Sequence, residues 1–138
     1  MKPINCILLI DDNATDNVFH QIIINDADIC NCLNIVTGGQ EGLEYIIKSA
    51  EPESTRPKPD LIYLDINMPR MNGFEFLEEY EKLDSKLKTG IHIIMLTTSL
   101  NPVDKFRALA DKSVMDFQNK PLTVEMLQQT AKKYFSEK

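Results

Sequence analysis

Polar and charged side chains follow four short apolar segments of this sequence, at the points where buried strands would end. These side chains are Asp11, Asp12, Asp65, Thr97 and Lys120. An ionised carboxylate is costly to bury without a partner, so an aspartate at the end of a buried strand needs a cation or proton donors nearby. The sequence therefore predicts a site where acidic groups, a hydroxyl and an amine act together.

Three aspartates brought close together would repel one another, and the pKa of each would rise unless a cation were bound. A divalent ion with oxygen ligands relieves this repulsion, and Mg²⁺ suits one or two carboxylates together with waters and a phosphate. Lys120 adds a fixed positive charge, and Thr97 adds a hydroxyl donor. This combination suits a phosphoryl group, whose transfer is catalysed mainly by positioning and charge neutralisation. One carboxylate can itself be the nucleophile and form an aspartyl phosphate.

The elements that must position these side chains alternate regularly along the chain. Apolar segments of strand length cover residues 4–10, 33–36, 61–64, 91–96 and 114–117. Segments with helical spacing of apolar residues cover 13–26, 43–50, a stretch after Gly73, 102–110, and a stretch that begins near Thr123. The polar, proline-rich segment 51–59 is expected to be a loop, because the alternation resumes directly after it.

Five alternations of strand and helix predict an α/β fold with a parallel sheet covered on both faces by helices. Because crossovers are right-handed, the natural arrangement is a doubly wound, flavodoxin-like (βα)5 three-layer sandwich with strand order 2-1-3-4-5. Ligands of such sheets bind at the carboxyl ends of the strands. The 138 residues match the usual size of one domain, so we expect a single domain over 1–138 with no output domain.

Composition narrows the class of partner. The formal net charge of −6 argues against nonspecific binding to nucleic acid or to an anionic membrane. No apolar run approaches the roughly 20 residues of a membrane-spanning helix, and Asp11 and Asp12 interrupt the N-terminal apolar run before it could form a signal peptide. Cys6, Cys30 and Cys32 are interpreted as free thiols in a reducing compartment. A cytoplasmic protein is expected.

The sequence resembles the receiver domain of bacterial two-component response regulators. Four segments carry the resemblance, in the order and spacing of the family. They are LLIDDN at 8–13, DLIYLDINMPRMNG at 60–73, IIMLTTS at 93–99 and FQNKP at 117–121. Any one of them alone would be weak evidence, but the four together span essentially the whole chain and fall at the expected strand ends.

The resemblance implies a phosphorylation site with a metal ion. Asp65 would accept a phosphoryl group from a sensor histidine kinase or a phosphotransfer protein. Asp11, Asp12 and Asp65 would hold Mg²⁺, together with the backbone carbonyl of Asn67.

The resemblance also implies a conformational switch. Thr97 would move to hydrogen-bond the phosphoryl group, and Lys120, before a cis Pro121, would pair with a phosphoryl oxygen. Phe117 occupies the position of the aromatic switch residue, although an aromatic side chain at a strand end is often simply part of the core. The surface formed by 102–110, the fifth strand and the last helix would then bind a downstream protein or a second copy of the chain.

Other functions remain open beside the phosphorylation switch. The same fold could serve as an interaction or dimerisation module that is not phosphorylated, although the intact acidic and basic residues count against this. A phosphatase with an aspartate nucleophile is the third alternative; its D-x-D pattern is not matched by the adjacent Asp11 and Asp12. A receiver would not be an enzyme beyond its own phosphorylation and dephosphorylation. His20 and His92 are expected to be structural.

Overall fold

A parallel sheet of five strands forms the centre of the protein in a computed structural model, which describes residues 2–136. The strands run in the order β2-β1-β3-β4-β5, and each neighbouring pair is parallel. They are β1 (Ile4–Ile10), β2 (Cys30–Val36), β3 (Leu61–Leu64), β4 (His92–Thr97) and β5 (Val114–Asn119). The predicted fold class and strand order are confirmed.

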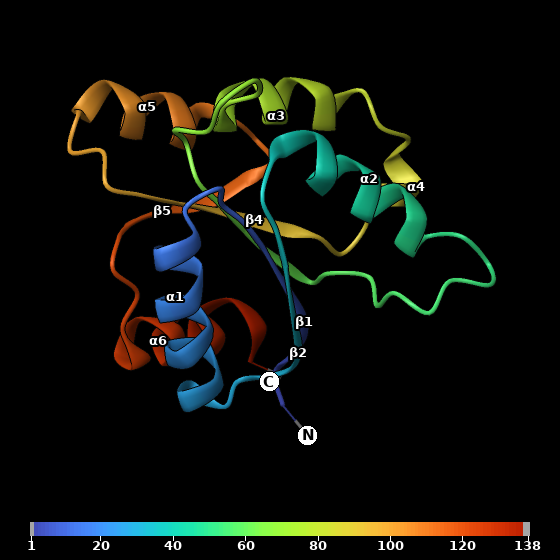
Figure 1. The fold of residues 1–138 in the computed structure, drawn as a ribbon, viewed down its shortest axis with the longest axis horizontal. Helices are drawn as coiled ribbons and strands as arrows, with labels where there is room; N and C mark the ends of the chain where they lie inside the picture. Colours follow the sequence, from blue (N-terminus) through green and yellow to red (C-terminus); the bar gives the residue numbers. More distant parts are fainter. Residues whose placement is uncertain (1, 137–138) are drawn as a thin grey trace.

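Helices cover both faces of the sheet and complete three layers (Figure 1). One face carries α1 and α6, and the other carries α2, α3, α4 and α5. Their bounds are α1 (Ala14–Ala27), α2 (Gly39–Ser49), α3 (Gly73–Glu81), α4 (Ser85–Lys88), α5 (Pro102–Ala110) and α6 (Val124–Phe135).

Two apolar clusters hold the layers together, one on each face of the sheet. In β1, Leu8 and Ile10 belong to the cluster under α2 and α3, whereas Ile7 and Leu9 belong to the cluster under α1 and α6. All four residues of β3 are buried. A strand buried on both sides is a continuous apolar segment in the sequence, which is why the position of β3 was predicted well. Any side chain at the end of β3 therefore extends from a rigid frame.

The edge strands are longer than the sequence predicts. β2 begins at Cys30 instead of residue 33, and β5 ends at Asn119 instead of residue 117. Backbone pairing sets these ends, because Cys30 is in register with Ile4 and Asn119 with Thr97. Apolar patterning cannot reveal a strand end that polar side chains occupy. β4 is displaced by one residue from its predicted range.

Two helices differ from the prediction for local reasons. α2 begins at Gly39, and its inward face includes Gly42, whose missing side chain leaves room for Ile10; an added Cβ would lie 2.6 Å from that side chain. Ile47, which the apolar spacing places on the buried face, is 43% exposed. α4 was not predicted, because four residues are too few to show helical periodicity.

The apolar residues of α1 face outward for the most part. Three of them, Val18, Phe19 and Ile22, are exposed. The buried positions of the helix are Asn17, His20, Ile24 and Ala27. The helix itself was predicted correctly, but its spacing of apolar residues does not identify the side that packs on the sheet.

Two further observations bear on the expected environment. Cys6, Cys30 and Cys32 are free thiols, as the sequence predicts. Between residues 2 and 136, no helix has both the length and the apolar composition needed to cross a bilayer.

Candidate functional site

The carboxyl ends of β1, β3, β4 and β5 meet at one edge of the sheet. Backbone hydrogen bonds fix this meeting. The N–H of Asp65 donates to the carbonyl of Ile10, and the N–H of Lys120 donates to the carbonyl of Thr97. Asp11 and Asp65 therefore extend from neighbouring strands, and Thr97 and Lys120 lie side by side on the next pair. The predicted convergence of the four strand ends is confirmed.

Three carboxylates form the centre of this edge. Asp11, Asp12 and Asp65 each offer an oxygen, and these oxygens all lie within 4.8 Å of one another. Asp11 and Asp65 are buried, whereas Asp12 is exposed. Burial and the neighbouring charge of Asp11 together raise the pKa of Asp65 to about 6, against the lowering effect of Lys120.

This donor set fits a magnesium ion. Carboxylate oxygens are the ligands that Mg²⁺ takes from proteins, and one exposed member leaves room for the waters that this ion retains. The cluster also carries excess negative charge that a cation would neutralise. Asn67, the fourth predicted ligand through its carbonyl, lies in the exposed loop after Asp65; its role stays a prediction.

Lys120 supplies the positive charge of the site. Its side chain is only 7% exposed, and its Nζ lies 2.6 Å from Asp11 Oδ2 and 3.6 Å from Asp65 Oδ1. These carboxylates raise the pKa of Lys120 against the opposing effect of burial, so the amine is charged. The Lys120–Pro121 peptide bond is cis, as predicted.

The loop after Asp65 is shaped to let α3 begin close to the site. Gly73 opens that helix, and an added Cβ at this position would lie 2.5 Å from the carbonyl oxygen of Asp65. Asn72 caps the helix by accepting from the N–H of Glu75, whose side chain accepts from the N–H of Asn72 in return. Glycine at residue 73 is thus required by the close approach of the two backbones.

Thr97 is buried at the end of β4 beside Lys120. Its Oγ1 accepts a hydrogen bond from the N–H of Ser99 at 3.1 Å. The side chain of Asn119 donates to the carbonyls of Thr97 and Ser99, which ties the loop after β4 to β5. The oxygen of the Thr97 hydroxyl therefore accepts from the loop after β4, and the predicted contact with a phosphoryl group would use its proton.

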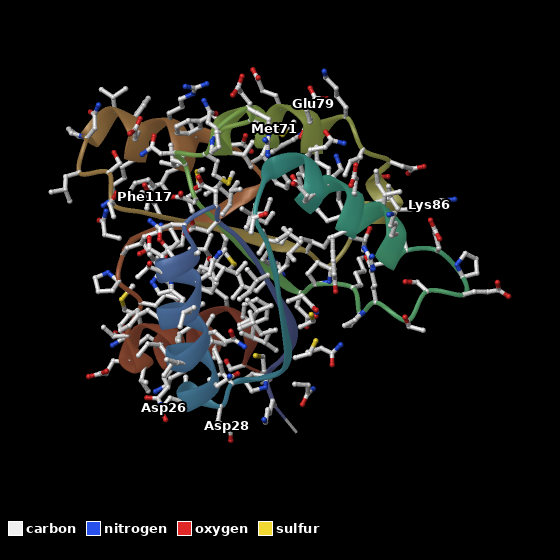
Figure 2. The ribbon with its side chains drawn as sticks, viewed as in Figure 1. Asp26, Asp28, Met71, Glu79, Lys86 and Phe117 are labelled. Atoms are coloured by element: carbon white, nitrogen blue, oxygen red, sulfur yellow. The ribbon has the colours of Figure 1, made fainter. Side chains whose placement is uncertain are left out.

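Phe117 lies on β5, below α5 in Figure 2, and is half-buried. It packs against the apolar cluster under α2 and α3, which also includes Ala108 of α5. This environment suits a core side chain as well as a switch residue, so its switch role stays a prediction.

Two residues of α1 at the site were not predicted to belong there. Asp16 Oδ2 accepts a hydrogen bond from Lys120 Nζ at 2.8 Å, and His20 Nε2 accepts one from the N–H of Leu122 at 3.3 Å. Burial and the charge of Lys120 lower the pKa of His20, so the imidazole is neutral. The expectation that His20 is structural agrees with this contact. Asp16 and His20 are four residues apart, the one signal in the sequence that could have placed them on a common face of α1.

Comparison with known proteins agrees with this geometry. The family model described as the response regulator receiver domain matches residues 7–132. The response regulator Rcp1 of Synechocystis is 34% identical over 103 residues, which cover 75% of this chain and 68% of Rcp1.

Solved structures of similar proteins share the fold. A two-component response regulator from Cytophaga hutchinsonii is 29% identical and superposes with a TM-score of 0.85, covering 96% of this chain and 97% of that chain. The phosphorylated cyanobacterial phytochrome response regulator RcpA is also 29% identical, with a TM-score of 0.72 over 93% of this chain and 89% of that chain. From its sequence match and its fold, the chain belongs to the response regulator receiver domain family of two-component signalling.

Proposed function

We propose that this receiver domain is a phosphorylation-dependent switch that accepts a phosphoryl group on Asp65 from a histidine kinase or a phosphotransfer protein. The observation that carries the proposal is the meeting of three carboxylates with a buried lysine at one edge of the sheet. A cation bound by these carboxylates would relieve their mutual repulsion, and the cation and the lysine together would neutralise the oxygens of a phosphoryl group. A phosphorylated relative with the same fold is consistent with this chemistry.

In the proposed reaction, a carboxylate oxygen of Asp65 forms a bond to phosphorus. The bond from phosphorus to the donor's imidazole nitrogen breaks, and the nitrogen keeps that electron pair. Asp65 must be ionised to react, and its pKa of about 6 leaves it ionised at neutral pH. Asp11, Asp12, Asp65 and the carbonyl of Asn67 would hold Mg²⁺, which when bound supplies positive charge against the carboxylates and the phosphoryl oxygens.

Lys120 and Thr97 would distinguish the phosphorylated state from the resting state. A phosphoryl group adds charge and acceptor oxygens, and it can shift a conformational equilibrium only through contacts that differ between the two states. In the resting state, Thr97 Oγ1 accepts from Ser99 and Lys120 lies 3.6 Å from Asp65. The Thr97 hydroxyl can donate its own proton to a phosphoryl oxygen, and Lys120 can exchange a carboxylate contact for one. Phe117 would follow the movement of Thr97.

The output surface would be the face formed by α5, β5 and α6. Four large apolar side chains are exposed on α5 and just before it, and we call them the α5 patch. They are Leu100, Val103, Phe106 and Leu109. Exposed apolar groups gathered on one helix are typical of a surface that binds protein. The proposed partner is a downstream protein or a second copy of the chain, and the protein would turn over no substrate beyond its own phosphoryl group.

One observation favours a second candidate function. The α5 patch is exposed in the resting state, with Leu100 86% and Phe106 78% accessible. A constitutive partner could therefore bind without phosphorylation, and the domain would then be an interaction module. The two functions differ in whether partner binding depends on Asp65.

Intact mass spectrometry tests the first function. The protein is incubated with Mg²⁺ and a small acyl phosphate, in parallel with Asp65→Asn, and beryllofluoride binding is measured as a second test. We expect one added phosphoryl group that requires both Mg²⁺ and Asp65. No adduct together with no beryllofluoride binding would overturn phosphorylation and favour the constitutive module.

A further inference from the structure

Lys120 also donates a hydrogen bond to a carboxylate outside the predicted site. Its Nζ lies 2.8 Å from Asp16 Oδ2, but 3.6 Å from Asp65 Oδ1. Asp11 is in close ionic contact at 2.6 Å, although its Oδ2 has no hydrogen-bond partner among the described residues. The ammonium group thus lies closer to the carboxylates of Asp11 and Asp16 than to that of Asp65, the proposed phosphoryl acceptor.

The backbone of Asp16 is fixed at the start of α1. It lies in the first turn of α1, where its N–H donates to the side chain of the N-cap residue Asn13 at 2.9 Å. The positive end of the helix dipole favours a carboxylate at this position. Its side chain is one third exposed, so the ion pair is of modest strength and can be broken by a competing anion.

The backbone around Lys120 is fixed independently of its side chain. The N–H of Lys120 donates to the carbonyl of Thr97, and the N–H of Leu122 donates to His20 on α1. A change of partner at this site therefore involves the lysine side chain, without movement of the loop. The distance to Asp65 is short enough for a rotation of the side chain to close it.

We propose that Asp16 is a positioning residue that holds Lys120 away from Asp65 in the resting protein and competes with the phosphoryl group for it. This inference rests on the proposed function. Binding of a phosphoryl group then requires Lys120 to exchange a carboxylate of α1 for a phosphoryl oxygen. Asp16 thereby weakens the phosphorylated state and opposes switching in the absence of a signal. An interaction can shift this equilibrium only if it differs between the unphosphorylated and the phosphorylated protein, and the proposed loss of the Asp16–Lys120 bond on phosphorylation is such a difference.

Beryllofluoride affinity at saturating Mg²⁺ tests the inference in the full chain. We expect Asp16→Asn to tighten binding by about fivefold, the factor that corresponds to ~1 kcal/mol for a partly exposed ion pair. Asp16→Glu retains the carboxylate within reach of Lys120 and should restore the affinity of the original protein. A purely structural role for Asp16 would lower the melting temperature without tightening the binding.

The matched control is Asp26→Asn, which removes the same charge from the opposite end of α1, where Asp26 is exposed (Figure 2). It should leave the affinity unchanged. Equal or weaker binding by Asp16→Asn overturns the inference while the proposed function stands. No binding by the original protein overturns the proposed function and this inference with it.

A crystal structure of resting Asp16→Asn examines the lysine directly. Lys120 Nζ should move to within hydrogen-bond distance of Asp65, below the 3.6 Å seen with Asp16 present. A lysine that stays in place would show that Asp16 does not hold it, and would overturn the inference.

Discussion

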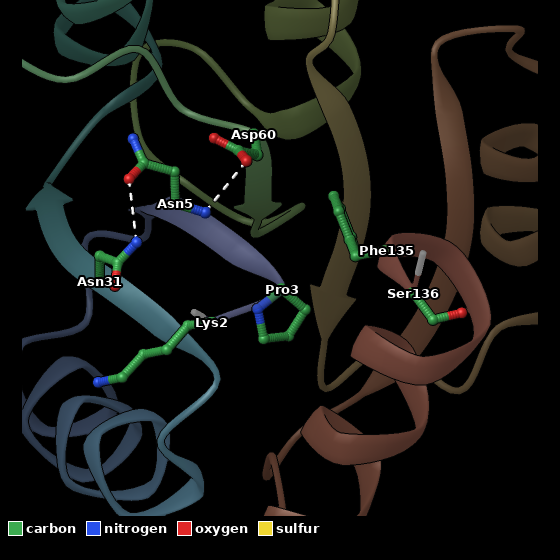
Figure 3. A pocket seen from close by; sticks show the side chains of 7 residues that line it. All are labelled: Lys2, Pro3, Asn5, Asn31, Asp60, Phe135 and Ser136. Atoms are coloured by element: carbon green, nitrogen blue, oxygen red, sulfur yellow. Dashed lines mark hydrogen bonds between the residues drawn. The ribbon is translucent and has the colours of Figure 1, made fainter. Parts of the chain in front are cut away.

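The two ends of β3 each carry an aspartate, and their surroundings differ sharply. Asp60 precedes the strand, and its carboxylate accepts from the N–H of Asn5 at 3.0 Å and from the N–H of Cys6 at 3.4 Å. Figure 3 shows it beside Asn5 on the wall of a cavity of about 540 Å³. Asp65 follows the strand and faces the carboxylates of Asp11 and Asp12, with Lys120 Nζ 3.6 Å away.

This difference separates a structural carboxylate from a reactive one. Asp60 joins β1 to β3 by hydrogen bonds that any acceptor of the same shape could make. Asp65 meets like charges that only a cation can neutralise, so its charge is the feature that matters. Both residues are aspartates that lie next to the same strand. Their roles differ because Asp60 contacts backbone amides of β1, whereas Asp65 contacts other carboxylates and Lys120.

Magnesium binding should separate the two aspartates most strongly. Asp65→Asn removes one of three carboxylates from the cluster, so we expect the affinity for Mg²⁺ to fall by at least about tenfold, as when groups around a metal site are lost. Asp60→Asn, at the other end of the strand, should leave this affinity unchanged. Isothermal titration calorimetry on both variants measures it, and equal losses would mean that the cluster does not bind the ion.

Much of the site was visible in the sequence, because buried strands are continuous apolar runs and the polar residue that ends each run is conspicuous. Asp11, Asp65, Thr97 and Lys120 were placed at one edge on that basis, and the backbone hydrogen bonds there agree. The partner of Lys120 could not be predicted. Three carboxylates lie within 4.0 Å of its Nζ, and one of them, Asp16, is brought there by the packing of α1.

The orientation of α1 escaped prediction for a related reason. Its apolar residues suggest a buried side, but Val18 and Ile22 are each 61% exposed. Asn17 can be buried because its side chain donates to the carbonyl of Asp11. The spacing of apolar residues does not predict the burial of a polar side chain whose hydrogen-bond partner lies outside the helix.

The stability of the metal-free protein should depend on pH through Asp65. Burial and the charge of Asp11 raise the pKa of Asp65 from 3.8 to about 6 in the folded state. The folded protein therefore binds this proton more tightly than the unfolded chain. The resulting stabilisation is complete below pH 3.8 and is lost as the pH rises through about 6, a total of about 3 kcal/mol.

Urea denaturation in the presence of a chelator, at several pH values from 4 to 8, measures this dependence. Asp65→Asn should lack the fall in unfolding free energy that the original protein shows near pH 6. Asp60→Asn should keep it. Parallel profiles for the original protein and Asp65→Asn would show that the crowded carboxylates do not control the pKa.

The smallest effects should come from Asp60, where two variants that both remove the charge differ in whether an acceptor oxygen remains. Asp60→Ala removes both acceptors of the amides of Asn5 and Cys6 and should lower the unfolding free energy by about 1–2 kcal/mol. Asp60→Asn keeps one oxygen for the shorter of the two bonds, so its cost should be only about 0.5 kcal/mol. Urea denaturation at neutral pH with Mg²⁺ compares the two variants. If Asp60→Asn lowered the unfolding free energy as much as Asp60→Ala does, the charge of Asp60 would contribute to stability, and not only its acceptor oxygens. Both ends of β3 would then depend on a charged carboxylate, and they would differ only in the groups that each carboxylate contacts.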